Sequence, residues 1–430
     1  MRGGLLTATV FLLAAIAISG VLPLWLDEII QLRETRNTTP AQLLASLPRQ
    51  PGAAPLGYMV QQTMLQATGY SIRRARVPGA LFMAGSILLV AVLGAELGLA
   101  TPWFAAAVFA LFPFTLRYGT ESRIYSQALF FSILATILFV RLMKTPRRLN
   151  VVLYCLALMA AIYTQPYAVF VGPAHVAWAL FQDRKSAARA AFAVAVATAT
   201  FLPWYLAARA IWSSGITGAG LHFVLSPKTP LMLFREVAGA GYWGSGLLLI
   251  LCILALARPT RSFSLLLSLL IAIPIVLAIT ADAVSGYFVA TRQIIWVLPS
   301  LAIFAALAIE RTPRIALPLV ALFAAISLWQ SFHYFTQPRE NWEIAANTIA
   351  DELKQAPCLI VVPPEQQLSY AYFRHELAHT QCPAPKTVLA ITPYATAAQR
   401  EAAVAALTAQ GYTRQSGTES GKSQVSLFTR

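Results

Sequence analysis

The strongest constraint on the fold of this chain is a series of apolar windows, each about 20 residues long, which recur from the N-terminus to residue 333. An α-helix of about 20 apolar residues is long enough to cross the hydrocarbon core of a bilayer. We expect about eleven spans, at approximately 4–24, 78–98, 102–117, 124–143, 150–164, 167–182, 190–209, 241–257, 262–281, 293–309 and 315–333. Only 11% of the residues are charged, against roughly 25% in soluble domains. The sequence therefore predicts an all-α polytopic membrane protein over residues 1–335.

Basic residues in the short loops indicate the orientation of the spans. Such loops read RLMKTPRR (141–148), DRKSAAR (183–189), RPTR (258–261) and ERTPR (310–314). In this span count all four fall on the same side as Arg2, and clustered Lys and Arg mark the cytoplasmic side. We expect the first span to be retained rather than cleaved as a signal peptide, because further spans follow it. The net charge of +15 is thereby explained by topology, and no motif for nucleic-acid binding accompanies it.

The region 336–430 has a different character and predicts a small α/β domain outside the membrane. Helical patterns at 341–355, 366–377 and 397–412 alternate with strand-like runs at 358–364, 387–391 and 423–430. The third helix should end at Gly411, a common C-cap residue. In this orientation the domain lies outside the cytoplasm, where Cys358 and Cys382 could form a disulfide.

Polar residues collect in the first outer loop, 25–77. The stretch LPLWLDEII (22–30) places Asp27 and Glu28 at the outer membrane–water boundary, directly after the first span. The same loop ends in SIRRARVPG (71–79), which holds Arg73, Arg74 and Arg76. Arginine binds phosphate bidentately and stays charged, so these residues are candidates for an anionic ligand at the membrane surface. The alternative is that they face lipid headgroups or pair with Glu34.

A second outer cluster, LRYGTESRIYSQ (116–127), lies between the third and fourth spans. Glu121 and Tyr125 are four residues apart and share a face if the segment is helical. This cluster also holds Arg123, and Arg292 stands at the start of a later span on the same side. The alternative is a locally neutralised helix end without a ligand.

Three stretches together resemble the GT-C superfamily of glycosyltransferases, which use polyprenyl-phosphate sugars. The acidic WLDE after the first span resembles the first acidic motif of the superfamily. The residues Pro55, Leu56 and Tyr58, followed by Arg76, Pro78, Gly79, Ala80 and Leu81, resemble its next conserved stretch. The triplet Glu121, Arg123 and Tyr125 is similar to its second outer motif, and QPRENWEIAANTIADEL to the start of the outer domain in protein mannosyltransferases, ArnT and RgtA/B/C/D-like enzymes. Ala54 and Gly57 depart from the pattern.

The resemblance implies an inverting transfer of a sugar from a polyprenyl phosphate to a hydroxyl of a lipid, glycan or protein acceptor. Asp27 would be the general base, and Glu28 and Glu121 are further candidate catalytic residues: Glu28 would orient the acceptor or support the loop, and Glu121 would orient an arginine or bind the sugar. The resemblance also implies a bacterial inner membrane, with the active site and the C-terminal domain on its periplasmic or extracellular side. Arg73, Arg74, Arg76, Arg123 and Arg292 would bind the donor phosphate, and Tyr58 and Tyr125 the sugar or lipid. No cofactor is expected, although a divalent ion at Asp27 stays open. The alternatives are a transporter or lipid flippase, whose ionisable residues typically lie near the midplane, and a noncatalytic subunit of a membrane assembly.

Overall fold

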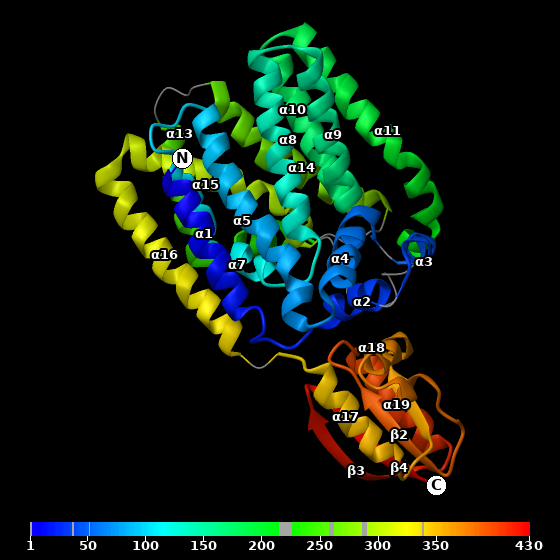
Figure 1. Ribbon diagram of the computed structural model, residues 1–430. Coiled ribbons are helices and arrows are strands. Elements are labelled where there is room, and N and C mark those ends of the chain that lie inside the picture. Colours follow the sequence, from blue (N-terminus) through cyan, green and yellow to red (C-terminus); the bar gives the residue numbers. More distant parts are fainter. Residues whose placement is uncertain are drawn as a thin grey trace.

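The computed structural model describes residues 2–36, 38–50, 52–214, 226–257, 262–285, 290–337 and 339–430. Its helical part begins with α1 (Arg2–Ile18) and resumes with α5 (Ile72–Glu96) (Figure 1). The residues between these two helices, 19–71, are called the outer segment below. The following helices are α6 (Pro102–Leu111), α7 (Pro113–Gly119), α8 (Tyr125–Lys144), α9 (Arg148–Thr164), α10 (Val171–Leu180), α11 (Arg184–Ser214), α12 (Thr229–Glu236), α13 (Gly241–Leu256), α14 (Ser262–Ser285), α15 (Leu298–Arg311) and α16 (Pro313–Thr336). The 3-10 helices η2 (Pro166–Phe170) and η3 (Thr291–Val297) lead into α10 and α15.

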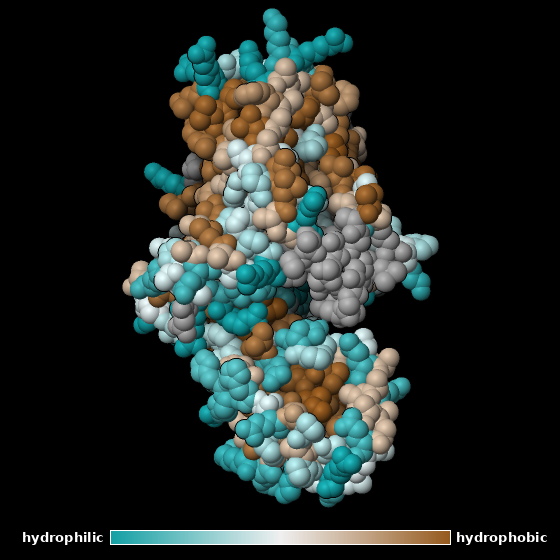
Figure 2. Space-filling model, turned by 90° about the vertical axis from the view of Figure 1, so that its right-hand side faces the viewer, coloured by the Kyte–Doolittle hydropathy of each residue, from teal (hydrophilic) through white to brown (hydrophobic). Residues whose placement is uncertain are grey.

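Most predicted spans coincide with a single apolar helix, which confirms the polytopic fold. The exceptions are 102–117, which covers α6 and α7, 167–182, which covers η2 and α10, and 293–309, which covers η3 and α15. Among the described residues, six helices are long and apolar enough to cross a membrane, or seven if the bent pair α12 and α13 counts as one span. The helices α1, α6 and α9 are apolar but shorter. Figure 2 shows apolar side chains over the helical part, whereas the C-terminal domain is mostly hydrophilic on the face shown. The exposed leucines and aromatics of α9, α11 and α16 fit contact with lipid.

The predicted third span, 102–117, is not one helix. It breaks at Phe112, whose ψ of 129° is extended, because the following Pro113 disfavours a helical conformation in the residue before it. The break separates α6 from α7, and the second predicted cluster, 116–127, follows at the end of α7. The basic loop predicted at 258–261 lies outside the described residues.

The first outer loop is itself mostly helical. It contains α2 (Leu26–Thr35), α3 (Pro40–Ser46), η1 (Leu47–Arg49) and α4 (Pro55–Thr68). The helix α5 begins at Ile72, where Ser71 accepts a hydrogen bond from the backbone N–H of Arg74. The three arginines predicted to end a loop therefore lie in the first turns of a helix.

The C-terminal region forms the expected small α/β domain. A four-stranded sheet has the order β1–β2–β4–β3, with β1 parallel to β2 and the other pairs antiparallel. Its elements are α17 (Trp342–Leu353), β1 (Cys358–Val362), η4 (Pro364–Gln366), α18 (Gln367–Ala371), η5 (His375–Ala378), β2 (Lys386–Ile391), α19 (Ala397–Ala409), β3 (Thr413–Ser420) and β4 (Ser423–Thr429). The single helix predicted at 366–377 is broken into three short pieces, and β3 was not predicted.

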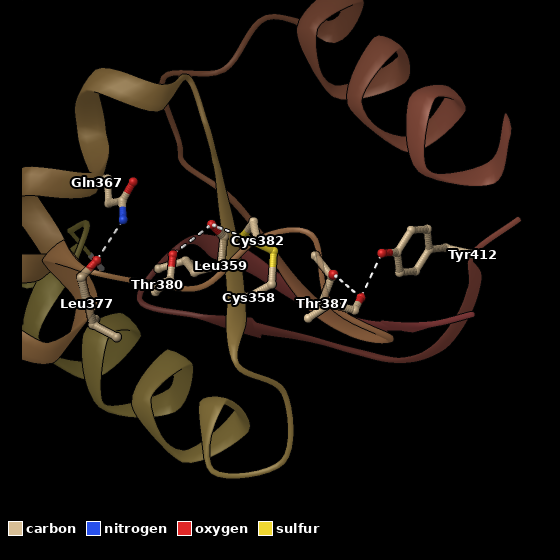
Figure 3. The surroundings of a disulfide bond; sticks show 9 residues. Cys358, Leu359, Gln367, Leu377, Thr380, Cys382, Thr387 and Tyr412 are labelled. Atoms are coloured by element: carbon tan, nitrogen blue, oxygen red, sulfur yellow. Dashed lines mark hydrogen bonds between the residues drawn. A yellow bond between two sulfur atoms is a disulfide. The ribbon is translucent and has the colours of Figure 1, made fainter. Parts of the chain in front are cut away.

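A disulfide joins Cys358, the first residue of β1, to Cys382 in the loop that leads to β2 (Figure 3). The hydroxyl of Thr380 lies 3.5 Å from the carbonyl oxygen of Leu359 beside it. The bridge spans 24 residues that hold α18 and η5. The disulfide therefore closes the loop that carries α18 and η5, which lies on the side of the domain next to the outer segment.

The domain and the outer segment share one hydrophobic core. Leu26, Ile29 and Leu32 of α2 belong to the same buried cluster as Trp342 and Ile349 of α17. All five side chains are at most 4% exposed. Burial of apolar surface contributes about 25 cal/mol per Å², so this shared core holds α2 against the domain. The helix α2, which carries Asp27 as its second residue, is thus held in place by packing against the C-terminal domain.

Candidate active site

A buried ion pair fixes the start of α2. The guanidinium of Arg76 donates to both carboxylate oxygens of Glu28, with distances of 2.8 Å to Oε1 and 2.7 Å to Oε2. Glu28 is 0% and Arg76 is 1% exposed. Glu28 Oε1 also accepts from the backbone N–H of Ser122 at 2.7 Å. The pair therefore connects α2, α5 and the loop before α8.

Arg76 has no N–H left for a substrate phosphate. Besides its two bonds to Glu28, its guanidinium donates to the carbonyl oxygens of Ser19, Leu22 and Pro23. A guanidinium has five N–H donors, and all five are used. In this geometry Arg76 offers no free N–H to a donor phosphate. Glu28 is completely buried, which fits its predicted role in supporting the loop better than a direct role at the acceptor. Both residues hold the backbone on either side of Asp27.

Asp27 is the carboxylate that remains accessible. Its side chain is 21% exposed, and its Oδ2 lies 3.7 Å from Arg123 Nη2 and 3.6 Å from Arg292 Nη2. The other terminal nitrogen of Arg123 donates to the Asp27 backbone carbonyl at 2.8 Å and to Gln31 Oε1 at 3.2 Å. The structure therefore brings together three predicted site residues from α2, the loop before α8 and η3.

Glu121 anchors a second group of cations. Its Oε1 accepts from Arg117 at 3.2 Å, Arg339 at 3.3 Å and the Tyr334 hydroxyl at 2.7 Å. Burial alone would raise the pKa of Glu121, but the two guanidiniums and the hydroxyl outweigh burial and lower it. Glu121 is 1% exposed, so its carboxylate is shielded from solvent and bonded to Arg117 and Arg339.

Trp25 lies between the two groups. The guanidinium carbons of Arg339, Arg117 and Arg292 are 5.2, 5.6 and 5.9 Å from its ring centroid. Cations within about 6 Å of an indole face are attracted to its π electrons. The residue that caps α2 thus gathers arginines from three elements into a single cluster.

Several buried polar atoms in this cluster have no partner among the described residues. They are Trp25 Nε1, Arg123 Nε, one terminal nitrogen of Arg339 and Glu121 Oε2. Leaving such atoms unsatisfied costs about 1–3 kcal/mol each. Three of the four are hydrogen-bond donors, which is the arrangement that an anion would satisfy.

The two predicted tyrosines lie beside the arginines. Tyr125, the first residue of α8, accepts from Arg292 Nε at 2.9 Å, and the Arg123 guanidinium lies 5.5 Å from its ring. Tyr58 of α4 is 4% exposed and packs with Leu43 and Ile124. Burial raises the pKa of Tyr58 despite the nearby Arg123, so the phenol stays protonated.

The structure does not bring Arg73 and Arg74 into this cluster. Both are exposed in the first turn of α5. Arg74 donates to the carbonyl oxygen of Thr68 at 2.6 Å, and Arg73 lies against Gly20 at the end of α1. Neither forms an ion pair with a described residue, and neither contacts Asp27 or Glu121.

The sequence predictions missed Arg117, Arg339 and Tyr334 as site residues. Arg117 carried a signal, since it lies four residues before Glu121. Tyr334 and Arg339 lie 213 and 218 residues from Glu121, at the end of the last span and in the link to the domain. Nothing in the local pattern of that link distinguishes Arg339 from a solvated arginine.

The cluster has a net positive charge, because it contains more arginines than carboxylates. Four guanidiniums, from Arg117, Arg123, Arg292 and Arg339, face the carboxylates of Asp27 and Glu121. Within the described ranges no three His, Cys, Asp or Glu side chains come together as metal ligands. The arrangement suits a phosphate held next to one accessible carboxylate.

Comparisons with known proteins find similarity at the level of the fold. No protein-family model matches the sequence, and no curated protein matches it significantly. The crystal structure of ArnT from Cupriavidus metallidurans in the apo state aligns over 97% of both chains with a TM-score of 0.61 and 14% identity. The same enzyme bound to undecaprenyl phosphate aligns over 98% of this chain and 97% of that one, with a TM-score of 0.61 and 15% identity.

An oligosaccharyltransferase from Archaeoglobus fulgidus aligns more weakly, over 86% of this chain and 57% of that chain, with a TM-score of 0.48 and 14% identity. At these identities the likeness concerns the fold. The chain shares the fold of ArnT over nearly its whole length, which agrees with the fold that its motifs predicted.

Proposed function

We propose that this protein is an integral membrane glycosyltransferase. It transfers a sugar from a polyprenyl-phosphate donor to the hydroxyl of an acceptor outside the cytoplasm. The observation that carries the proposal is the accessible Asp27 carboxylate, 3.6 and 3.7 Å from two guanidiniums. The GT-C fold supports it, and ArnT, a structural neighbour with the same fold, has been crystallised with undecaprenyl phosphate.

The donor phosphate would bind between Arg123 and Arg292. Their separation from Asp27 exceeds hydrogen-bond length, so the three groups attract one another without being locked together. A phosphate between the guanidiniums would take over these interactions and leave the carboxylate to the acceptor. The excess of two positive charges in the cluster of four arginines and two carboxylates favours an anion at this position.

Asp27 would then act as general base. As the acceptor oxygen bonds to the anomeric carbon, its proton passes to the Asp27 carboxylate. The bond from the anomeric carbon to the phosphate oxygen breaks, and its electron pair leaves with the polyprenyl phosphate. The arginines stabilise the charge that develops on this leaving group. A single displacement of this kind inverts the anomeric centre.

The position of the site and the disulfide of the C-terminal domain support a reaction on the outer face. The helix α2, which carries Asp27, lies at the end of the helical part that faces the C-terminal domain (Figure 1). Disulfides persist in oxidising compartments, and the bond between Cys358 and Cys382 supports a periplasmic or extracellular location for that domain. The acceptor would reach Asp27 from this side, and lipid, glycan and protein hydroxyls all fit the proposed chemistry.

The test is mass spectrometry of lipid-linked sugars and envelope glycans in cells that lack the protein. We expect one polyprenyl-phosphate sugar to accumulate and one glycan to lose a residue. Periodate added to intact spheroplasts should oxidise the accumulated sugar, which places it on the outer leaflet. Accumulation protected from periodate would indicate a flippase, and an unchanged profile would contradict both functions.

A further inference from the structure

The N-terminal end of α2 is capped by Glu340, a residue in the link that leads to the C-terminal domain. The backbone N–H of Leu26, the first residue of α2, donates to Glu340 Oε1 at 3.1 Å across 314 residues. The N-cap residue Trp25 offers no side-chain oxygen for this purpose. The first N–H groups of a helix have no intrahelical acceptor, and a carboxylate there also interacts favourably with the helix dipole. Glu340 therefore fixes the residue that immediately precedes Asp27.

Glu340 is in turn held by the C-terminal domain. The Tyr394 hydroxyl donates to the same Oε1 at 2.7 Å. The Tyr394 ring lies parallel to the buried Trp342, with centroids 6.3 Å apart and an interplanar angle of 12°. Burial and the Glu340 carboxylate raise the pKa of Tyr394, so the hydroxyl keeps its proton and remains a donor. A chain of two hydrogen bonds thus runs from the domain to α2.

The residue before Glu340 acts on the other half of the site. Arg339 contacts both Glu121 and the face of Trp25. In the link between α16 and α17, Arg339 therefore contacts Glu121, and the next residue, Glu340, contacts α2, the helix that carries Asp27. A displacement of the domain would therefore move this link and change the position of Asp27.

We infer that Glu340 is a positioning residue for the proposed transfer, and that Tyr394 of the C-terminal domain holds it in place. The inference rests on the proposed function and adds a role for the domain: it sets the orientation of Asp27 toward the acceptor hydroxyl. Misplacing a catalytic group by about 1 Å can cost on the order of 100-fold in rate. Loss of the cap should thus lower kcat while the donor phosphate still binds between Arg123 and Arg292.

Three variants and one control separate positioning from stability. Glu340→Ala removes both hydrogen bonds, Tyr394→Phe removes only the hydroxyl, and Glu340→Gln keeps an oxygen that can accept both. The matched control is Tyr370→Phe, because the buried Tyr370 hydroxyl donates to Ser423 at 2.8 Å, a hydrogen bond between two elements of the same domain. Each full-length protein is purified and added to membranes of cells that lack it, which contain the unused donor and acceptor.

We expect Glu340→Ala to lower kcat at least about 10-fold, which corresponds to about 1.4 kcal/mol, with the donor KM changed less than about twofold. Tyr394→Phe should show a smaller loss, and Glu340→Gln and Tyr370→Phe should stay near wild type. If Glu340→Ala lowers Tm but leaves kcat per folded molecule unchanged, the positioning role is refuted. Failure of the proposed function would look different, because then the wild-type protein would transfer no sugar in this assay.

Discussion

Arg76→Ala should lower the stability of the protein, because Arg76 supports α2 and does not itself bind the donor phosphate. In Arg76→Ala the Glu28 carboxylate, which is 0% exposed, would lose its charged partner. Truncating one member of a buried ion pair costs about 3–5 kcal/mol, because the other charge stays buried without compensation. Three backbone carbonyls that accept from Arg76 would lose their donor as well, so we expect the upper part of this range.

The measurement is the free energy of unfolding from denaturant titration in detergent, together with Tm. A double variant, Glu28→Gln with Arg76→Met, is the internal comparison. It removes both charges at similar volume, and we expect it to be less destabilised than Arg76→Ala, although the carbonyl bonds are lost in both. A loss below about 1 kcal/mol in Arg76→Ala, the range of exposed ion pairs, would refute the structural role. So would normal stability combined with lost affinity for undecaprenyl phosphate.

Three further predictions concern the phosphate seat, the disulfide and metal dependence. Arg292→Gln should weaken the binding of undecaprenyl phosphate about 10-fold, as measured by native mass spectrometry. This is the lower end of the roughly 1.5–3 kcal/mol for a hydrogen bond to a charged group, and it is expected because the Arg292 side chain is 24% exposed. Arg73→Gln should bind like wild type, and equal losses in the two variants would contradict the assignment. Replacing Cys358 and Cys382 by serine should destabilise the C-terminal domain by about 3 kcal/mol, since the bridge spans 24 residues, and an unchanged melting curve would argue against the bond. EDTA should leave sugar transfer unaltered because guanidiniums neutralise the leaving phosphate, whereas inhibition reversed by Mg²⁺ or Mn²⁺ would require a metal in the mechanism.

Hydrophobic periodicity and length were sufficient to predict the membrane helices. The window of about 20 apolar residues is imposed by the bilayer itself, so it persists without any knowledge of tertiary contacts. The prediction failed where a local rule interrupted the pattern, as at Phe112 before Pro113. Strand β3 was missed because its residues are nearly all exposed and polar, so it has no alternating apolar face.

The candidate site was predictable in its residue types but not in its partners. Asp27, Arg123, Arg292 and Tyr125 come together as expected. Arg73 and Arg76 are close in sequence and start the same helix, yet only Arg76 is buried. The difference arises from the carbonyls of Ser19, Leu22 and Pro23, which cover Arg76 from 53–57 residues away.

The contributions of Arg339 and Glu340 lie still further from local pattern. Their contacts span 218 and 314 residues and depend on how the C-terminal domain packs on α2. That packing uses Leu26, Ile29 and Leu32, which in the sequence read as an ordinary apolar stripe. Only the folded chain shows that the stripe is covered by the domain.

The most direct test of the central claim is sugar transfer by Asp27→Asn. The purified variant is added to membranes of cells lacking the protein, beside wild type and beside a measurement of undecaprenyl-phosphate binding. The amide has nearly the shape of the carboxylate but cannot accept the proton, so we expect transfer to fall at least about 100-fold, with the phosphate bound at least as tightly as by wild type. Transfer at the wild-type rate by Asp27→Asn would contradict the account.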